Sequence, residues 1–318
     1  MSADRDTYSG LLALGIDAGG TETRWALARA TGEIAAEGQV RGFSALQVHE
    51  AERPFVVEAL DELSRQVLAV GRPARAHAGL TGFGGESEAL KALIAAPLAL
   101  SADAVSVGSD IETAYLDLFA PGEGYVVYAG TGSVGAFIDI DGALHRVGGR
   151  GVVVDDAGGG YWIAREALRV VWRAEDERPE SWRASPLATE LFSMVGGSDY
   201  SHTRRHVYEG TRGDVGRLAL AVARAADRDA RAREILLAAG AELARLAGIM
   251  IERHGPRPVA LTGRAAGLHP LIAEAMRAAL PAAVELQLRP SRGHHAAAHL
   301  ALRAALGHAP FASARREP

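Results

Sequence analysis

The sequence predicts an α/β protein built of two related halves. Apolar runs that suit buried strands alternate with longer stretches of amphipathic helical spacing, a pattern typical of sheets covered by helices. A glycine–threonine turn also occurs twice, as DAGGTET at 17–23 and as AGTGSVG at 129–135, and each turn lies between two apolar runs. The two turns therefore predict that one strand–turn–strand arrangement is used once in each half.

The first half is predicted to begin with three strands in a meander and to continue with alternating helices and strands. The predicted strands are residues 11–19, 23–30, 34–40, 74–82 and 104–110, and the predicted helices are residues 48–70, 86–97 and 111–120. Proline and two glycines in PGEG at 121–124 then separate the last helix from the next strand. We therefore place the domain boundary there, which gives domains of 1–121 and 122–318.

The second half repeats the pattern with a longer helical insertion. Three strands are predicted first, and the Asp-Gly turn at 141–142 favours a hairpin between the second and third. The predicted strands are residues 124–130, 134–140, 143–149, 258–263 and 283–288, and the predicted helices occupy 160–254, 269–281 and 293–307. Both Gly-Thr turns therefore fall between strands one and two of their halves.

Composition excludes several function classes. Of 318 residues, 48% are hydrophobic, and the net charge of −5 gives no electrostatic reason to expect a nucleic-acid or membrane partner. The chain has no cysteine and its first residues lack a signal-peptide pattern, so we expect a cytoplasmic protein without an iron–sulfur cluster. Lys91 is the only lysine and has no glycine-rich approach, which excludes a P-loop and a protein kinase.

The two turns predict sites for phosphate oxygens, because glycines let backbone N–H groups converge without obstruction by side chains. Asp17 precedes the first turn and would repel phosphate, so we expect it to act through a Mg²⁺ ion. Facing each other across a cleft, the turns would hold the triphosphate of ATP. The predicted phosphate-binding residues are Gly19, Gly20, Thr21, Gly130, Thr131, Gly132 and Ser133.

Five motifs occur in the order found in one superfamily. They are DAGGTET, GSDIETAY, AGTGSVG, LTGRAAG and SRGHHAAAHLAL, and they resemble the phosphate 1, connect 1, phosphate 2, adenosine and connect 2 motifs of actin, the sugar kinases and Hsp70. The segment VGGRGVVVDDAGGGYWIAREAL further resembles N-acetylglucosamine kinases and the wider BadF/BadG-type ATPase family. The resemblance covers residues 11–307 and implies a two-domain actin-like ATPase (ribonuclease H-like) fold with a nucleotide cleft between the domains.

The resemblance also implies roles for single residues. Asp110, which we expect to be the N-cap of the connect 1 helix, takes the place of the general base. Asp156 and Thr131 are implied sugar contacts, Gly263 is an implied adenosine contact, and we also assign Thr81 to substrate binding together with Asp110. The implied activity is an ATP- and Mg²⁺-dependent kinase for N-acetylglucosamine or glucosamine, acting at the 6-hydroxyl.

This chain departs from the family pattern at positions that face the sugar. Ala45, Arg150 and Ala157 stand where asparagine, tryptophan and glutamate are common, and Arg264 replaces a glycine of the adenosine motif. A lost polar contact changes discrimination between substrates strongly. Arg150 therefore has two interpretations. It could pair with the carboxylate of a muramic acid derivative, which remains an alternative substrate, or it could be a solvent-exposed arginine without a role in binding.

Two other function classes stay open: an ATP-binding sensor with a decayed sugar pocket, and an ATPase without a sugar partner. Activators of 2-hydroxyacyl-CoA dehydratases resemble the same domain but need cysteines, which this chain lacks. His294, His295 and His299 lie on the last predicted helix, where two ligands on one face do not make a metal site, so we expect them to pack. The helix-rich region 186–254 is the candidate surface for a homodimer.

Overall fold

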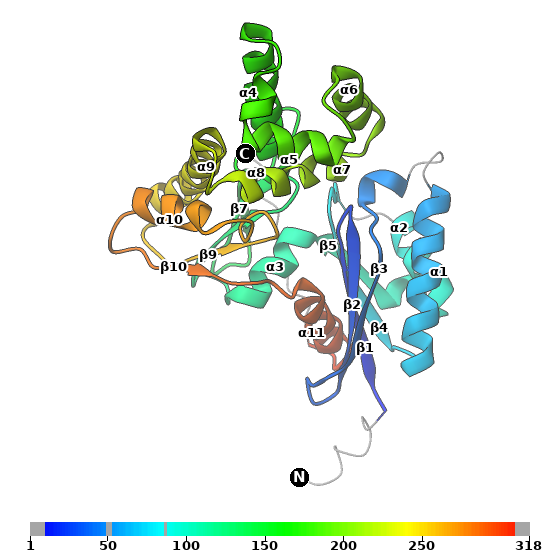
Figure 1. Ribbon diagram of the computed structural model, residues 1–318. Helices are drawn as coiled ribbons and strands as arrows, with labels where there is room; N and C mark the ends of the chain where they lie inside the picture. Colours follow the sequence, from blue (N-terminus) through cyan, green and yellow to red (C-terminus); the bar gives the residue numbers. More distant parts are fainter. Residues whose placement is uncertain (1–9, 49–52, 86–87, 309–318) are drawn as a thin grey trace. The chain divides into compact units, whose positions relative to one another are not determined.

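A computed structural model describes residues 10–48, 53–85 and 88–308. The chain divides into two compact units, which are coloured along the sequence in Figure 1. The described parts of Met1–Pro121, Ile138–Leu144 and Ser291–Pro318 form the first unit, and Gly122–Phe137 with His145–Pro290 forms the second. Both units are sheets with helical cover, so the predicted α/β class is confirmed. The nucleotide cleft between the domains stays a prediction.

The sheet of the first unit has the strand order β3-β2-β1-β4-β5. Its strands are β1 (Leu12–Ala18), β2 (Glu22–Arg29), β3 (Ile34–Arg41), β4 (Arg75–Leu80) and β5 (Val105–Ser109). The first three form the predicted antiparallel meander, and β4 and β5 then add on parallel to β1. Parallel addition needs crossover connections, which the intervening helices α1 (Arg53–Val70) and α2 (Glu88–Ala95) provide.

The two faces of this sheet are covered in different ways (Figure 1). Large side chains such as Leu14 and Ile16 form the core on the face that α1 and α2 cover. Alanines dominate the other face, where α11 (Gly293–Ala305) packs with its own Ala298 and Ala301. A Cβ atom added to Gly15 would lie 2.0 Å from the backbone nitrogen of Ala298. Small residues on β1 therefore let the backbone of α11 approach the sheet closely.

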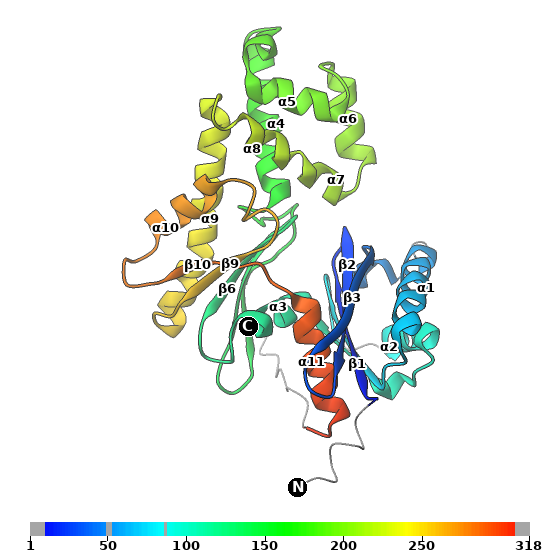
Figure 2. The same cartoon turned by 60° about the horizontal axis from the view of Figure 1, so that its bottom comes forward.

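The sheet of the second unit has the order β10-β9-β6-β7-β8, and Figure 2 labels its strands β10, β9 and β6. Its strands are β6 (Tyr125–Ala129), β7 (Ser133–Ile138), β8 (Leu144–Gly148), β9 (Val259–Thr262) and β10 (Leu286–Leu288). Counted within each unit, both sheets have the order 3-2-1-4-5. The predicted architectural repeat is confirmed, including the place of each Gly-Thr turn between the first two strands.

The long helical region predicted for 160–254 consists of successive helices. They are α4 (Gly160–Glu177), α5 (Pro186–Val195), α6 (Tyr200–Glu209), α7 (Arg212–Arg217), α8 (Ala219–Ala225) and α9 (Ala230–His254), and α10 (Pro270–Ala279) follows β9. Local signals set the breaks: Ser185 caps α5 through the amide of Ala188, and Gly196 ends that helix at a φ of +94°. Leu246 and Met250 of α9 lie against Gly135 and Gly148 of the sheet.

The last helix shows where the predicted domain division differs from the structure. The boundary at 121/122 coincides with the division between the units, but α11 belongs to the first unit rather than to a domain of 122–318. Its contacts with β1, β4, β2 and with α3 (Asp110–Leu118) explain why. The order of elements along the sequence does not indicate that α11 packs on the first sheet, because the helix and the sheet lie near opposite ends of the described residues.

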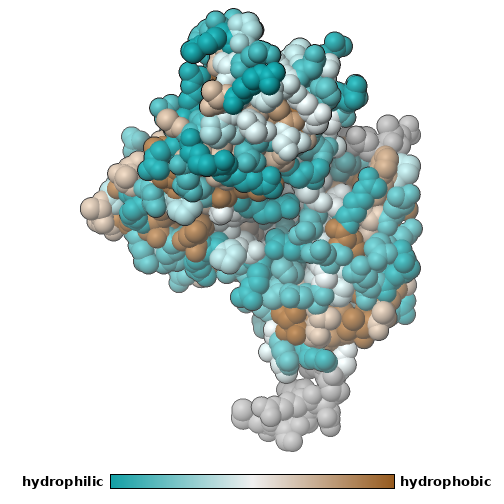
Figure 3. All heavy atoms as spheres, viewed as in Figure 1, coloured by the Kyte–Doolittle hydropathy of each residue, from teal (hydrophilic) through white to brown (hydrophobic). Residues whose placement is uncertain are grey.

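Large hydrophobic side chains are exposed at scattered positions of the described residues, such as Ile140, Val153 and Tyr208. Figure 3 shows a face that is mostly hydrophilic, with hydrophobic residues in small scattered groups, as is usual for protein surfaces. In the described part of the chain, no helix combines the length and the apolar character needed to cross a membrane.

Candidate functional site

Three predicted site residues lie at one edge of the first sheet. The register of parallel strands places Ala18 beside Leu80 and Leu80 beside Ser109. Asp17, Thr81 and Asp110 are each one residue from these positions, so they meet at the carboxyl ends of β1, β4 and β5. Ligands of α/β sheets bind outside this edge.

Asp110 is held in place by short hydrogen bonds. Its Oδ2 accepts a hydrogen bond of 2.5 Å from the hydroxyl of Thr81, and its Oδ1 accepts one of 2.8 Å from the amide of Ile111. Ser109 occupies the N-cap position of α3 without a capping hydrogen bond from its side chain, and Asp110 is the first residue of the helix, which corrects the expectation that Asp110 is the N-cap. The carboxylate is partly exposed at the strand edge and has a fixed orientation.

Asp17 carries a negative charge in a poorly solvated place. Its side chain is 18% exposed and accepts a hydrogen bond of 3.2 Å from Arg24, which is its cross-strand partner in β2. Desolvation raises the pKa of Asp17 to about 6, and the nearby Asp110 and Asp117 carboxylates add to that effect against the opposing influence of Arg24. This edge of the sheet therefore favours a bound cation.

Arg24 was not predicted as a site residue, although the sequence holds a signal for it. A tight turn at 19–21 fixes the hairpin register, and that register puts Arg24 opposite Asp17. Asp117 also was not predicted as a site residue. Its carboxylate accepts a hydrogen bond of 2.7 Å from the amide of Arg292, a contact between distant parts of the sequence that no local pattern indicates.

The first turn is open. The amide of Gly19 donates to the carbonyl of Glu22 at 3.1 Å, whereas Gly20 and Thr21 are exposed. A Cβ atom added to Gly20 would have no neighbour within 4 Å. The turn is therefore accessible at Gly20 and Thr21.

The segment GFSALQ at 42–47 packs against this turn. A Cβ atom on Gly42 would lie 2.4 Å from the carbonyl oxygen of Gly19, so glycine is required for the approach. The amide of Ala45 donates to the carbonyl of Thr81 at 3.0 Å. The segment predicted to read the sugar therefore stands beside the strand edge that carries Asp110, although Ala45 brings no polar side chain.

The second turn is bonded to the start of α4. The amide of Gly160 donates to the carbonyl of Gly130 at 2.8 Å, and the amide of Tyr161 donates to the carbonyl of Thr131 at 2.9 Å. The hydroxyl of Ser133 is buried and donates to the carbonyl of Ala157 at 2.7 Å. Ser133 thus fixes the neighbouring loop, and its hydroxyl donates its hydrogen to that contact rather than to a phosphate.

Asp156 stands against this second turn. A Cβ atom added to Gly132 would lie 2.1 Å from Oδ2 of Asp156, and Oδ1 accepts a hydrogen bond of 3.0 Å from the amide of Gly151. The backbone of Asp156 is left-handed, with a φ of +51°, which aspartate tolerates better than most residues. Burial raises the pKa of Asp156 despite that hydrogen bond. The structure therefore brings Asp156 together with Thr131 and Gly132.

Gly263 lies at the corresponding edge of the second sheet. It follows β9 with a φ of +97°, and a Cβ atom there would lie 2.4 Å from the carbonyl oxygen of Ala129 at the end of β6. Only glycine fits this position. Among the departures from the family pattern, Arg150 and Arg264 are exposed and Ala157 is buried.

A sequence profile decides the family of this chain. The profile of the BadF/BadG/BcrA/BcrD ATPase family matches residues 14–285. The chain belongs to this family. A search of curated protein sequences finds no match.

Solved structures with the same fold include sugar kinases. A provisionally named N-acetylglucosamine kinase from Chromobacterium violaceum is 25% identical with a TM-score of 0.69, and the match covers 92% of this chain and 99% of that one. A second provisionally named one, from Porphyromonas gingivalis, is 17% identical with a TM-score of 0.66 over 89% and 96%. A Streptomyces griseus glucokinase of the ROK family, in complex with glucose and AMPPNP, is 15% identical with a TM-score of 0.58 over 91% and 98%. The fold is that of the actin-like ATPase sugar kinases.

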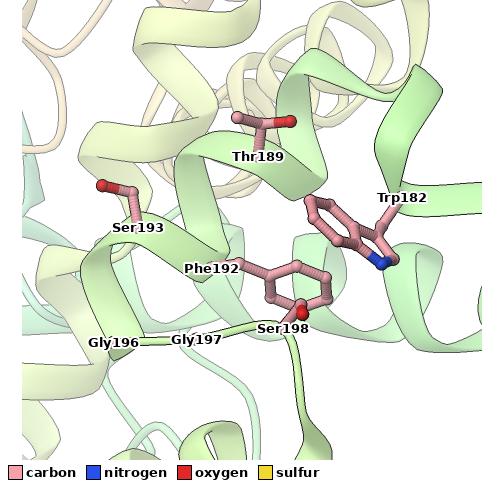
Figure 4. A pocket seen from close by; sticks show the side chains of 7 residues that line it. All are labelled: Trp182, Thr189, Phe192, Ser193, Gly196, Gly197 and Ser198. Carbon is pink, nitrogen blue, oxygen red and sulfur yellow. The ribbon is translucent and has the colours of Figure 1, made fainter. Parts of the chain in front are cut away.

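A pocket of about 420 Å³ lies elsewhere in the second unit (Figure 4). Its rim is formed by the Trp182 and Phe192 rings together with small residues around the end of α5; its lining is Trp182, Thr189, Phe192, Ser193, Gly196, Gly197 and Ser198. None of the predicted site residues lines it. It carries no charged side chain, so it offers no acid or base for catalysis.

Proposed function

We propose that this ATPase-family protein is a kinase that transfers the γ-phosphoryl group of ATP to a hydroxyl of an amino sugar, N-acetylglucosamine or glucosamine, at the 6-position. The observation that carries the proposal is the fixed carboxylate of Asp110 at the carboxyl edge of the first sheet, close enough to Asp17 to raise the pKa of that residue. This arrangement supplies a base and a cation-binding group at one edge.

In this proposal Asp110 acts as the general base. The sugar hydroxyl oxygen attacks the γ-phosphorus, its proton passes to the Asp110 carboxylate, and the bond from the γ-phosphorus to the bridging oxygen breaks to release ADP. The hydroxyl of Thr81 and the amide of Ile111 orient the carboxylate, so that the proton acceptor is aimed before the sugar binds. Thr81 acts as a positioning residue that also borders the substrate.

Asp17 is the residue that fits a magnesium ion. It is an oxygen ligand in a poorly solvated place with Arg24 as its paired cation. Bound Mg²⁺ would neutralise negative charge on the phosphate oxygens. Arg24 keeps the Asp17 carboxylate oriented toward the strand edge.

The two turns are proposed to bind phosphate oxygens through their backbone amides. Gly20 and Thr21 do so from an open turn, and Thr131 and Gly132 from a turn held rigid by α4. Gly263 is proposed to let the adenosine approach the backbone, and Asp156 with Thr131 to contact sugar hydroxyls. The glucose and AMPPNP bound in the Streptomyces griseus glucokinase support this use of the fold. We propose a cytoplasmic enzyme, with region 186–254 as its homodimer surface.

The test is ADP release from Mg-ATP with glucosamine, N-acetylglucosamine, N-acetylmuramic acid, glucose or no sugar. We expect turnover with one amino sugar and a loss of about 100-fold or more in Asp110→Asn. Asp103→Asn is the matched control, because Asp103 is an exposed carboxylate away from the strand edge. Sugar-independent turnover would instead indicate an ATPase. Nucleotide binding without any turnover would indicate a sensor, the class that the substitutions at Ala45, Arg150 and Ala157 favour.

A further inference from the structure

Three metal-ligating side chains converge at the edge of the first sheet where β3 meets α11. The ligand atoms of Glu37, His294 and His295 all lie within 4.8 Å of one another. Oε2 of Glu37 is 3.3 Å from Nε2 of His294 and 2.6 Å from Nε2 of His295. The sequence places His295 and His299 on one helix face, and two ligands alone do not make a metal site. The structure instead adds Glu37 to His294 and His295, from a strand 257 residues away in the chain.

The spacing of these atoms suits a small divalent ion. Zinc bonds to nitrogen and oxygen of about 2.0–2.1 Å in a tetrahedron place neighbouring ligand atoms about 3.3 Å apart. The 3.3 Å distance between Glu37 and His294 matches that value. The 2.6 Å distance between Glu37 and His295 is about 0.7 Å shorter, so the exposed Glu37 carboxylate and the His295 ring would have to move apart by that amount to admit the ion. Imidazole nitrogens with one carboxylate are a donor set for zinc-class transition metals rather than for Mg²⁺ or Ca²⁺.

We infer that Glu37, His294 and His295 form a binding site for a zinc-class divalent ion, with a fourth position open to water. Solvent reaches the site from the side of Glu37, whose side chain is 58% exposed, whereas the side chains of His294 and His295 are 7% and 16% exposed. A buried pair of imidazoles with an exposed carboxylate gives an ion both fixed ligands and an entry path.

The surroundings limit how tightly this site holds its ion. Arg24 is near enough to His294 to disfavour a second positive charge there, although its ion pair with Asp17 offsets part of that effect. Among the described residues, Nδ1 of His294 has no hydrogen-bond partner, so no outer hydrogen bond supports this ring from the side away from Glu37. Outer hydrogen bonds usually strengthen metal affinity 10–100-fold. We therefore expect micromolar rather than tighter binding.

The bound ion would join the edge strand β3 to the first turn of α11. Gly293, the first residue of that helix, already lies against Asp17: a Cβ atom there would be 3.1 Å from Oδ2 of Asp17. The ion would therefore clamp the helix end that borders the Asp17 carboxylate. This inference does not depend on the kinase proposal, because binding is measured without nucleotide or sugar.

The experiment is zinc binding to the full chain after removal of metals with a chelator, followed by competition with a chromophoric chelator. We expect one Zn²⁺ bound per chain, and a loss of affinity of about 100-fold or more in Glu37→Gln and in His295→Ala. His299→Ala is the matched control. His299 lies on the same helix, but its Nε2 faces the carbonyl of Gly32 at 2.9 Å. The zinc affinity of His299→Ala should therefore equal that of the unchanged protein.

Two further readouts separate ligand loss from misfolding. Cobalt(II) at this site should give the visible absorption of a tetrahedral ion in the unchanged protein and in His299→Ala, and Glu37→Gln should lose it. Saturating zinc should raise the Tm by about 5 °C, again without Glu37→Gln responding. The inference is overturned if the unchanged protein binds no zinc below millimolar concentration, or if Glu37→Gln folds and binds zinc as tightly as His299→Ala.

Discussion

The two Gly-Thr turns occupy the same place in two sheets of the same strand order, yet their surroundings differ. Around the first turn, a Cβ atom on Gly20 would meet nothing within 4 Å. Around the second, a Cβ atom on Gly132 would strike the carboxylate of Asp156, and α4 bonds to the carbonyls of Gly130 and Thr131. The same strand order therefore supports an open turn that follows the charged residue Asp17 and a closed turn that contacts a loop and a helix.

The strands next to the turns, β1 and β7, also differ in how rigid the atoms packed against their glycines are. Gly15 of β1 faces the backbone of α11, whereas Gly135 of β7 faces the flexible end of the Met250 side chain. The first sheet has a rigid neighbour on this face and the second has an adaptable one. The difference predicts that equal substitutions have unequal effects.

The largest effect is expected for Gly15→Ala. A methyl group there would lie 2.0 Å from the nitrogen of Ala298 and 2.2 Å from the carbonyl oxygen of His294, so α11 must move away from the sheet. The free energy of unfolding should fall by about 3 kcal/mol or more, and hydrogen exchange should rise in β1 and α11. Gly135→Ala should lower it by about 1 kcal/mol, because Met250 can turn aside. Equal effects in urea unfolding would show that α11 yields as easily as a side chain.

The second expected effect concerns the charge in front of the first turn. The pKa of Asp17 is raised to about 6, so the folded protein binds this proton more tightly than the unfolded chain does. The stability that protonated Asp17 contributes to the folded protein is therefore lost as the pH rises from about 4 to 6. Relative to the unchanged protein, Asp17→Asn should gain on the order of 2–3 kcal/mol in free energy of unfolding across that interval, and should gain no more above it.

Tyr128 holds the corresponding position before the second turn and provides the control. Tyr128→Phe should differ from the unchanged protein by a constant amount between pH 4 and 7, because a phenol does not titrate there. Urea unfolding at a series of pH values measures both differences. A flat difference for Asp17→Asn would mean that solvent or Arg24 already compensates the buried charge.

The third effect compares the turns directly. Gly132→Ala should lower the free energy of unfolding by about 2 kcal/mol, because Asp156 must leave the amide of Gly151 to make room. Gly20→Ala should change it by less than about 0.5 kcal/mol, since the turn is exposed. Thermal unfolding of the two variants beside the unchanged protein measures this, and a larger loss in Gly20→Ala would contradict the open description of the first turn.

Much of the fold and of the candidate site follows from local sequence. Alternating apolar runs with turn residues between them predict the strands of both sheets, and the parallel register then brings Thr81 and Asp110 together. The hairpin register alone would have added Arg24, because a turn at 19–21 determines which residue faces Asp17. Local physical rules determine these features, so the sequence predicts them.

Other features depend on contacts between residues that are far apart in the sequence, which local patterns do not predict. Glu37 reaches His294 only because α11 returns to the first sheet, and no local signal predicts the left-handed backbone of Asp156 or its contact with Gly132. The hydroxyl of Ser133 turns inward because the carbonyl of Ala157 is within reach. The cap of α3 shifts by one residue to Ser109, an error within the usual uncertainty of helix ends.

The return of α11 to β1 also bears on how the protein is made. The first unit is the first to leave the ribosome, but its sheet keeps the alanine face around Gly15 uncovered until residues 293–305 have been synthesised. The second unit is complete at Pro290 and can fold earlier, although most of its residues come later in the chain. The nascent N-terminal sheet therefore keeps one face uncovered while the second unit is being synthesised, and the emergence of α11 is the event that allows this face to be covered.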